Sequence, residues 1–265
     1  MTEERRRPGR LGAMADLPVQ YYAGHDGTKL AYRELGQGRP VVLIHGYFSN
    51  ATTNWIRYGH AAAVAERGFR VIMPDLRGHG DSAKPQDPAA YPPDILADDG
   101  FALIEALGLT GYALGGYSLG GRTTVRMLAR GAAPDRAVIA GMGLDGIVHA
   151  SARNGHFRRI LENRGSWDRR SPEGKAEAFM KSTGADPVAG LYLLDSNVDT
   201  PPAVLAGIGL PVLVLAGDED DDNGKAEDLA AAFPHGQAGR VPGNHMSAVA
   251  QPDLGRAIAA YLAGP

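Results

Sequence analysis

One serine in this chain lies in a pattern that would make it a nucleophile. Gly116-x-Ser118-x-Gly120 stands between a short apolar segment, Thr110–Leu114, and a stretch with helical periodicity, Arg122–Arg130. A serine at such a sharp strand-to-helix turn exposes its hydroxyl, and the flanking glycines leave room for neighbouring backbone. The helix would direct its free N–H groups at the serine, which favours a developing negative charge. The alternative is a glycine-rich structural turn or a phosphate loop, but no lysine follows as a P-loop requires.

A serine hydroxyl is a weak nucleophile at neutral pH and needs a base beside it. Histidine suits this task because its ordinary pKa of about 6.5 lets it take up and return a proton near pH 7. His245 is the strongest candidate, because it lies in the glycine-containing turn 242–246, just after the last expected strand. His45 and His79 stand among glycines near strand ends and are expected to brace loops. The remaining histidines are expected to face solvent or an inserted segment, and two of them, His149 and His156, are candidates for substrate contact: His25, His60, His149, His156 and His235.

The base in turn needs an acid that holds its tautomer and stabilises the imidazolium. Five acidic residues follow an expected strand at Asp218–Asp222, between Ser118 and His245 in chain order. Most of them are expected to form a solvated turn, and the position of the run indicates that one is catalytic. Their spacing does not tell which one. Asp145, at the end of the preceding expected strand, is the alternative location.

An acyl-transfer site also needs two N–H donors for the oxyanion of the tetrahedral intermediate. The backbone N–H of Leu119, next after the nucleophile, is expected to be one of them. The other is expected from the loop after His45-Gly46, from Tyr47 or Phe48.

Strands and helices alternate along the chain, which predicts βαβ units. Strands are expected at Val19–Ala23, Lys29–Glu34, Pro40–Ile44, Arg70–Pro74, Thr110–Leu114, Arg136–Met142, Pro211–Ala216 and Gln237–Val241. Helices are expected at Trp55–Arg67, Ile95–Leu107, Arg122–Arg130, Lys225–Phe233 and Leu254–Leu262. The predicted fold is therefore α/β, a mainly parallel sheet of the eight-stranded type with helices on both faces. Ligands of such sheets bind beyond the carboxyl ends of the strands, where His45, Asp75, Ser118 and Gly217 should gather.

The interval 144–210 does not fit this alternation, because a crossover needs only about a dozen residues. Capping residues followed by proline at Ser171, Asp186 and Thr200 indicate helix starts. We interpret 144–210 as a small helical lid over the strand ends, and a structural insertion packed to one side is the alternative. Residues 16–143 and 211–265 then form the core domain, and residues 1–15 are expected to be a disordered tail, with Met14 as an alternative start.

Composition narrows the range of partners. The net charge of −3 gives no reason to expect nucleic acid or an anionic membrane. The absence of cysteine removes disulfides and thiolate metal sites and leaves the redox compartment open. No apolar run is long enough to span a bilayer, and Asp16 and Pro18 interrupt what would be the core of a signal peptide, so a cytoplasmic location is expected. No cofactor or metal is implied, since Asp218–Asp222 lacks the spaced ligands of an EF-hand.

Taken together, these motifs resemble the α/β-hydrolase fold family over about Val19 to Leu262. The residues that carry the resemblance are His45-Gly46, Asp75-x-Arg77-Gly78-x-Gly80-x-Ser82, Gly116-Tyr117-Ser118-Leu119-Gly120-Gly121, Gly217-x-x-Asp220 and Gly243-x-His245. The resemblance implies a Ser118–Asp220–His245 triad, because the family's acid usually falls three residues after the strand-ending glycine. It also implies Tyr47 as the second oxyanion donor and a structural role for the Arg77-Gly78 motif.

A carboxylic ester hydrolase acting on a small-molecule substrate, of unknown oligomeric state, is the function that the resemblance favours. A serine at the turn argues against epoxide hydrolases and haloalkane dehalogenases, which use aspartate there. A carbon–carbon bond hydrolase is the main alternative and would be favoured by Arg153, Arg158 or Arg159 facing inward. Lactonase or perhydrolase activity with the same triad remains open, and a non-enzymatic ligand receptor is a remote alternative.

Overall fold

The computed structural model describes residues 17–264, and the expectations for residues 1–15 lie outside that range. Within it, eight strands form one sheet in the order β1-β2-β4-β3-β5-β6-β7-β8. Their bounds are β1 (Gln20–Ala23), β2 (Lys29–Leu35), β3 (Arg39–Ile44), β4 (Phe69–Pro74), β5 (Ala113–Tyr117), β6 (Ala137–Ala140), β7 (Val212–Gly217) and β8 (Gly236–Val241). The β1–β2 and β2–β4 pairs are antiparallel, and all other neighbours are parallel. The predicted fold class is confirmed.

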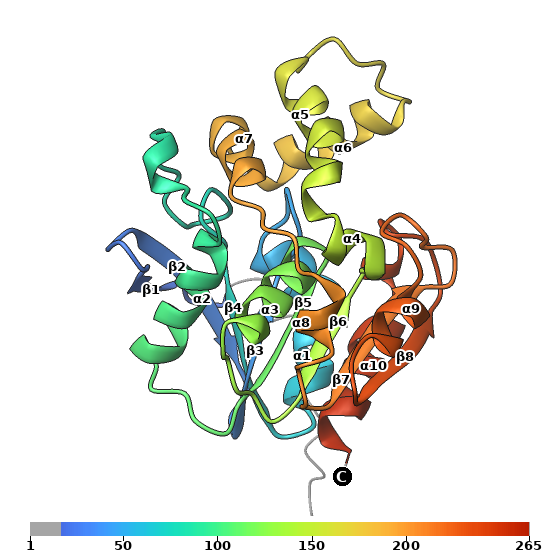
Figure 1. The fold of residues 1–265 in the computed structure, drawn as a ribbon. Coiled ribbons are helices and arrows are strands. Elements are labelled where there is room, and N and C mark those ends of the chain that lie inside the picture. The colour runs from blue at the N-terminus through green and yellow to red at the C-terminus, as the bar shows by residue number, and fades with distance from the viewer. Residues whose placement is uncertain (1–16, 265) are drawn as a thin grey trace, which may run out of the picture.

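Helices cover both faces of the sheet (Figure 1). One face carries α1 (His60–Ala65) and α10 (Pro252–Ala263). The other carries α2 (Ile95–Ala106), α3 (Leu119–Ala129) and α9 (Ala226–Ala231). Every residue of β5, β6 and β7 is buried, as expected for parallel strands that are enclosed on both sides.

Short helices occupy most of 144–210: α4 (Leu144–Val148), η4 (Ala150–Arg153), α5 (Asn154–Glu162), α6 (Pro172–Thr183), α7 (Pro187–Asp195) and α8 (Pro202–Leu205). Two of the expected helix starts are capped by side chains. Ser171 accepts a hydrogen bond from the N–H of Gly174, and Asp186 accepts from those of Val188 and Ala189. Helices α5, α6 and α7 form a layer beyond the end of the sheet at which β6 leads into α4 (Figure 1).

Three of the expected elements differ most from the structure. The helix expected at Trp55–Arg67 is two separate elements, a π-helix η2 (Thr52–Ile56) and α1, because Gly59 adopts a left-handed conformation with φ 79° between them. The strand before Ser118 is Ala113–Tyr117 rather than Thr110–Leu114, so it runs up to the serine itself. Helix α3 correspondingly begins at Leu119, three residues before the expected start. Two further short 3-10 turns are η3 (Pro88–Ala90) and η5 (Ala248–Ala250).

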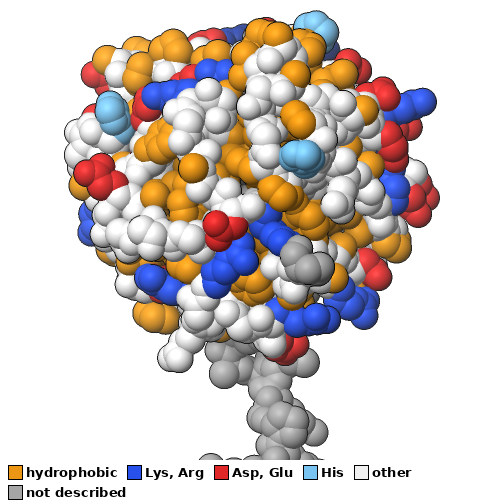
Figure 2. All heavy atoms as spheres, turned by 60° about the horizontal axis from the view of Figure 1, so that its bottom comes forward, with side chains coloured by type: hydrophobic (Ala, Val, Ile, Leu, Met, Phe, Trp, Pro, Cys, Tyr) orange, Lys and Arg blue, Asp and Glu red, His pale blue; other side chains and the backbone are white. Residues whose placement is uncertain are grey.

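Within residues 17–264, no helix is long and apolar enough to cross a membrane. Figure 2 shows the surface of the molecule with the lower end of Figure 1 turned toward the viewer. Basic and acidic side chains both occur across that face, among hydrophobic ones.

Candidate active site

Ser118 sits at a strained corner between β5 and α3. Its backbone has φ 54° and ψ −114°, a combination that non-glycine residues rarely adopt and that clusters at functional sites. The corner is possible only with glycine on each side. A Cβ on Gly116 would lie 2.3 Å from the backbone of Gly120, and one on Gly120 would lie 2.1 Å from the Ile44 carbonyl oxygen. The Gly-x-Ser-x-Gly pattern is therefore a packing requirement of this turn.

Three side chains that lie far apart in the sequence form a chain of hydrogen bonds at this corner. His245 Nε2 lies 3.0 Å from Ser118 Oγ, and His245 Nδ1 lies 3.0 Å from Asp220 Oδ2. The Asp220 side chain is 2% exposed and the His245 side chain is 16% exposed. The carboxylate oxygen can only accept, so Nδ1 carries the proton and Nε2 is free to accept from the serine hydroxyl. A neutral imidazole in this tautomer is poised to act as a base.

Burial separates Asp220 from the other acids of the run. Asp218, Glu219, Asp221 and Asp222 are exposed, as expected for a solvated turn. Asp218 accepts a hydrogen bond from the Gly243 N–H at 2.7 Å and so ties the histidine loop to the end of β7. The alternative location, Asp145, lies exposed in the first turn of α4.

Within residues 17–264, no hydrogen-bond acceptor is found for the backbone N–H groups of Tyr47 and Leu119, the two expected oxyanion donors. Leu119 is the first residue of α3, where an N–H has no partner inside the helix. The other candidate donor, Phe48, is occupied, because its N–H donates to His79 Nε2 at 3.2 Å. Of the two residues left open by the loop sequence, Tyr47 is thus the one with a free donor.

The loop that carries Tyr47 is held by two buried histidines. His45 Nε2 accepts from the Leu76 N–H at 2.9 Å, and His79 Nε2 accepts from the Phe48 N–H. Their Nδ1 atoms lie 2.8 Å from the Gly46 carbonyl oxygen and 3.0 Å from the Arg77 carbonyl oxygen, respectively. Both rings are therefore neutral braces between backbone groups, as expected from their surroundings.

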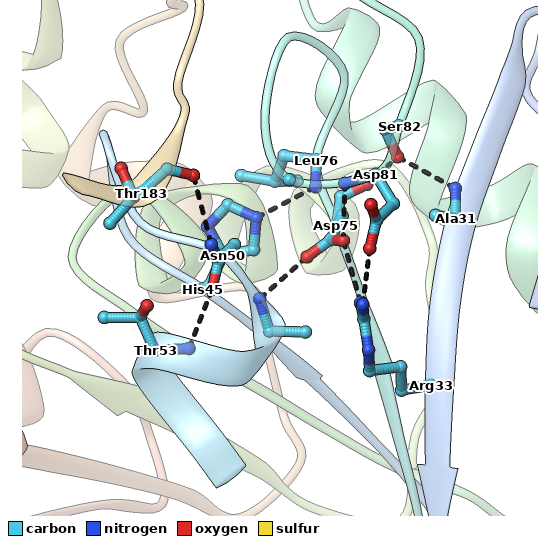
Figure 3. Close-up of polar contacts among 12 residues, drawn as sticks. Ala31, Arg33, His45, Asn50, Thr53, Asp75, Leu76, Asp81, Ser82 and Thr183 are labelled. Carbon is cyan, nitrogen blue, oxygen red and sulfur yellow. Dashed lines mark hydrogen bonds and ion pairs between the residues drawn. The ribbon is translucent and has the colours of Figure 1, made fainter. Parts of the chain in front are cut away.

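Asp75 ties the same loop to the rest of the sheet (Figure 3). Its carboxylate accepts from the Ala51 N–H at 2.8 Å and the Asp81 N–H at 2.9 Å, and pairs with Arg33 at 3.1 Å. Asn50 joins the Thr53 N–H, at 2.7 Å, to the Thr183 carbonyl oxygen at the end of α6. The oxyanion-side loop is thus fixed to both the core and the insertion.

Arg77 is fully buried and has a structural environment. Its guanidinium pairs with Asp26 and Asp99, each at 2.8 Å. At Gly80, a Cβ would lie 2.3 Å from the Asp75 carboxylate, so this position requires glycine. The Asp75-to-Ser82 motif holds loops together and directs no functional group at Ser118.

The buried histidines predict a loss of stability in acid. Burial lowers the pKa of His45 to about 4 and that of His79 to about 3. In the unfolded chain each imidazole takes up a proton below its ordinary pKa of about 6.5, so acidification favours unfolding. Between pH 7 and pH 5 each histidine should lower the free energy of unfolding by about 2 kcal/mol. Urea unfolding of His79→Gln should therefore show a pH 7-to-5 loss smaller by about that amount than the wild type.

The matched control is His235→Gln, because His235 is exposed. It should keep the wild-type dependence on pH. If His79→Gln lost as much stability between pH 7 and pH 5 as the wild type does, the neutral-brace interpretation would be wrong.

Tyr117 contacts the histidine loop, although the sequence assigns it no role beyond its place in the Gly116-Tyr117-Ser118 motif. Its hydroxyl donates to the His245 carbonyl oxygen at 2.7 Å, and its ring lies 5.5 Å from the imidazole. Burial raises the pKa of this phenol, so it remains a donor at neutral pH.

His60, expected to face solvent, is buried against Gly255 of α10, and its Nε2 lies 2.6 Å from the Val249 carbonyl oxygen.

A cavity of about 210 Å³ opens in front of Ser118 and His245. Much of its wall comes from the insertion, namely Asn154, His156, Phe157, Pro172, Ala176, Leu193, Leu194 and Asn197. The core contributes Asp222 of the acidic run, together with Arg122 and Asn223, for which the sequence predicts no role. His156, a candidate for substrate contact, lines this cavity.

Two of the arginines expected to face inward for a carbon–carbon bond hydrolase, Arg158 and Arg159, do not line this cavity. Arg158 pairs with Asp195, and Arg159 pairs with Glu173 at 2.9 Å, both at the surface of the insertion. The side chain of Arg153 lies outside the described part of the structure. The cation that does line the cavity is Arg122, whose Nε donates to the Gly146 carbonyl oxygen at 3.1 Å. In the sequence, the only indication that Arg122 lies near the site is that it directly follows the glycine-rich turn around Ser118.

Asp220, Asp222 and His245 are close enough to be considered as metal ligands, with donor atoms within 4.8 Å of one another. Asp220 and His245 already hydrogen-bond to each other, and the proton of that bond is on His245 Nδ1, which therefore cannot bind a metal. The arrangement therefore suits a proton relay better than a metal site.

A serine at a strained strand-to-helix corner, a histidine and a buried aspartate on an eight-stranded α/β sheet define a hydrolase-like scaffold. A family model described as alpha/beta hydrolase fold matches residues 39–146. A thermophilic esterase from Thermogutta terrifontis superposes with a TM-score of 0.74 at 25% identity, covering 92% of this chain and 98% of that one. The enol-lactonase from Burkholderia xenovorans LB400 has a TM-score of 0.71 at 22% identity, covering 92% and 100%. The chain has the α/β-hydrolase fold, and residues 39–146 match the model of that family.

Curated relatives are similar over part of their length. The AB hydrolase superfamily protein YisY of Bacillus subtilis (strain 168) is 34% identical over 121 residues, which are 45% of this chain and 43% of that protein. The non-heme chloroperoxidase CPO-A1 of Kitasatospora aureofaciens is 39% identical over 105 residues, 40% and 36% of the two chains. The chain thus spans less than half the length of these curated relatives. We therefore infer the reaction of this chain from its own candidate site.

Proposed function

We propose that this protein is a serine hydrolase that cleaves carboxylic esters through Ser118, His245 and Asp220. The observation that carries the proposal is the continuous relay from the buried Asp220 carboxylate through His245 to the Ser118 hydroxyl, with 3.0 Å at each step. A relay of this kind is what a serine needs to become a nucleophile at neutral pH.

The reaction follows from the relay in two halves. Ser118 Oγ attacks the acyl carbon while His245 Nε2 takes the hydroxyl proton, and Asp220 stabilises the imidazolium. The tetrahedral intermediate collapses when His245 returns that proton to the leaving alkoxide, which departs as the alcohol and leaves an acyl ester on Ser118. Water then attacks this ester with His245 as its base, which releases the carboxylic acid and restores the serine.

Negative charge develops on the former carbonyl oxygen during both halves. The N–H groups of Tyr47 and Leu119 are the proposed donors, and the Leu119 N–H is also at the positive end of the α3 dipole. The braces of the Tyr47 loop would keep its donor in place before the substrate arrives. Preorganised donors of this kind contribute roughly 3–4 kcal/mol each to transition-state stabilisation.

Helices α5 to α7 are proposed to act as a lid. They supply much of the cavity wall, and Tyr47 connects them to the nucleophile side by donating from its hydroxyl to the Gly190 carbonyl oxygen at 2.7 Å. Such a cover would limit water access and shape the acyl or alcohol site.

The proposal is tested by a panel of 4-nitrophenyl esters from acetate to octanoate together with a fluorophosphonate probe. We expect turnover of at least one short-chain ester and covalent labelling at Ser118, located by peptide mass spectrometry. Labelling should be absent in His245→Ala, which has no base. A folded protein that neither hydrolyses any member of the panel nor reacts with the probe would refute the proposal.

Arg122 favours one further candidate, hydrolysis of a carbon–carbon bond in a substrate that carries a carboxylate. Arg122 lines the same cavity as Ser118, and its positive charge would favour an anionic group of the substrate there. A vinylogous diketone with a dienoate carboxylate belongs in the same panel. Faster turnover of that compound than of every ester would replace the ester assignment with this one.

A further inference from the structure

A second cavity, of about 200 Å³, meets the Ser118–His245 pair from other elements. It shares Tyr47, Ser118, His245 and Met246 with the larger cavity. The rest of its wall is Gly46, Ser49, Thr53, Asn54, Tyr58, Tyr117, Phe179 and Val249. None of these lining residues is Lys, Arg, Asp or Glu, whereas the larger cavity includes Arg122 and Asp222. The second cavity is therefore the neutral side of the site.

One polar atom in its wall is buried without a partner. Asn54 is 2% exposed, and its Oδ1 accepts from the Gly46 N–H at 3.0 Å. That contact sets the orientation of the amide, because the Gly46 N–H can only donate and so must face the amide oxygen. Within residues 17–264, Asn54 Nδ2 then has no hydrogen-bond acceptor. A buried amide N–H left in this state is costly, and such groups in native proteins call for an explanation.

The backbone that presents Asn54 is unusual as well. Asn54 lies in the middle of the π-helix η2 (Thr52–Ile56), and both Thr53 and Asn54 line the cavity. π-Helices are rare and occur frequently at functional sites. The element is also near the reacting centre, since a Cβ on Gly46 would lie 3.3 Å from Ser118 Cβ and 3.7 Å from Asn54 Oδ1.

We propose that the second cavity is a substrate subsite, in which Asn54 Nδ2 donates to a neutral hydrogen-bond acceptor on the ester. This rests on the proposed ester hydrolysis. The acceptor is an ether, keto or further ester oxygen placed a few atoms from the scissile carbonyl. An ionised group does not suit the site, because the wall offers no opposite charge to offset desolvation. Esters of purely aliphatic acids and alcohols leave the Asn54 donor unmet and are the poorer substrates.

The test compares esters that differ only by one oxygen in place of a methylene. Methoxyacetate against butyrate esters of 4-nitrophenol probe the acyl side, and 2-methoxyethyl against butyl acetate probe the alcohol side. Asn54→Asp keeps an acceptor for Gly46 and removes the donor. The ratio of kcat/KM for the oxygen-bearing to the aliphatic ester should fall about three- to tenfold in Asn54→Asp for one of the two pairs. Intrinsic reactivity cancels, because the same esters are compared in both proteins.

Two variants support the comparison. Asn163→Asp makes the same chemical change at an exposed position of the insertion and should leave both ratios unchanged. Asn54→Ala removes both amide atoms without a buried carboxylate and should lower the same ratio, which keeps the test available if Asn54→Asp does not fold. An unchanged ratio for both pairs in the Asn54 variants would overturn the subsite.

Binding separates this inference from the proposed reaction. In Ser118→Ala, which lacks the nucleophile, calorimetric titration with the same esters should show the same preference, and adding Asn54→Asp should abolish it. A binding preference that depends on Asn54, with no turnover by the wild type, would refute ester hydrolysis and retain the subsite. Ester turnover that does not depend on Asn54 would refute the subsite. So would the absence of both turnover and an Asn54-dependent binding preference.

Discussion

Replacing Ser118 with alanine is expected to lower kcat for a short-chain ester by about 10⁶-fold, without loss of stability. The hydroxyl is the atom that forms the acyl ester, so its removal ends the covalent route, and only the oxyanion donors and the cavity still favour hydrolysis. The backbone strain at φ 54° is unaffected, because serine and alanine both carry a Cβ. Equal thermal unfolding midpoints for the two proteins, measured with the kinetics, would locate the defect in the chemistry.

The matched control for this experiment is Ser166→Ala, a serine of the insertion that is exposed and donates to the Asn163 carbonyl oxygen. It should hydrolyse esters at the wild-type rate. Retention of more than a few per cent of wild-type kcat in purified Ser118→Ala, with contamination excluded by the fluorophosphonate probe, would contradict a nucleophilic role for Ser118.

The fold could be predicted from the sequence wherever a continuous apolar run ends in a turn residue. The run at β3 and the run at β7 fit this description, and both strands lie within one or two residues of the expected bounds. The strand predicted at Thr110–Leu114 ends too early, because Gly115 and Gly116 favour a turn when only the local sequence is considered. In the folded chain they belong to β5, where they pair with Val138 and Ile139 of β6. Local composition carries no information about such a partner strand.

The site divides along a similar line. Chain order and turn chemistry suffice to select Ser118 and His245, which the structure brings within hydrogen-bonding distance. Asp220 could be selected only through the family resemblance, because its neighbours are equally acidic and differ in burial, a tertiary property. Tyr117 and Asn54 were missed for the same reason. Their hydrogen bonds span 128 and 8 residues, and no local pattern marks a tyrosine or an asparagine as a positioning group.

The π-helix could not be predicted either. Residues 52–56 lack a sequence signature that distinguishes a π-helix from the first turn of an ordinary helix, and Gly59 reads as a tolerated interruption. The wide turn is retained where tertiary contacts hold it, and Asn54 is anchored to Gly46 while Thr53 is anchored to Asn50. Violations of local rules in natural proteins are expected at functional sites, which is consistent with the subsite assigned to this element.

Asp220→Asn is expected to lower kcat by about 10⁴-fold while the protein stays folded. Asparagine has nearly the same shape but can direct an N–H at His245 Nδ1. The imidazole would then carry its proton on Nε2, where it could not accept from Ser118. The loss of negative charge also removes the group that stabilises the imidazolium during the reaction. Steady-state kinetics with the best ester of the panel, together with the rate of fluorophosphonate labelling, would measure both consequences.

Asp222→Asn is the discriminating control, because it makes the same substitution two residues away. Asp222 lies close to the pair, with donor atoms of Asp220, Asp222 and His245 all within 4.8 Å, yet it is exposed and His245 Nδ1 hydrogen-bonds to Asp220. Its loss should therefore change kcat by less than about fivefold, as expected for a solvent-screened charge near the site. A reversal of the two effects would assign the orienting role to Asp222. Comparable large losses of kcat in both variants would instead mean that the acidic turn as a whole holds the imidazole. The burial of Asp220 would then have no special catalytic consequence.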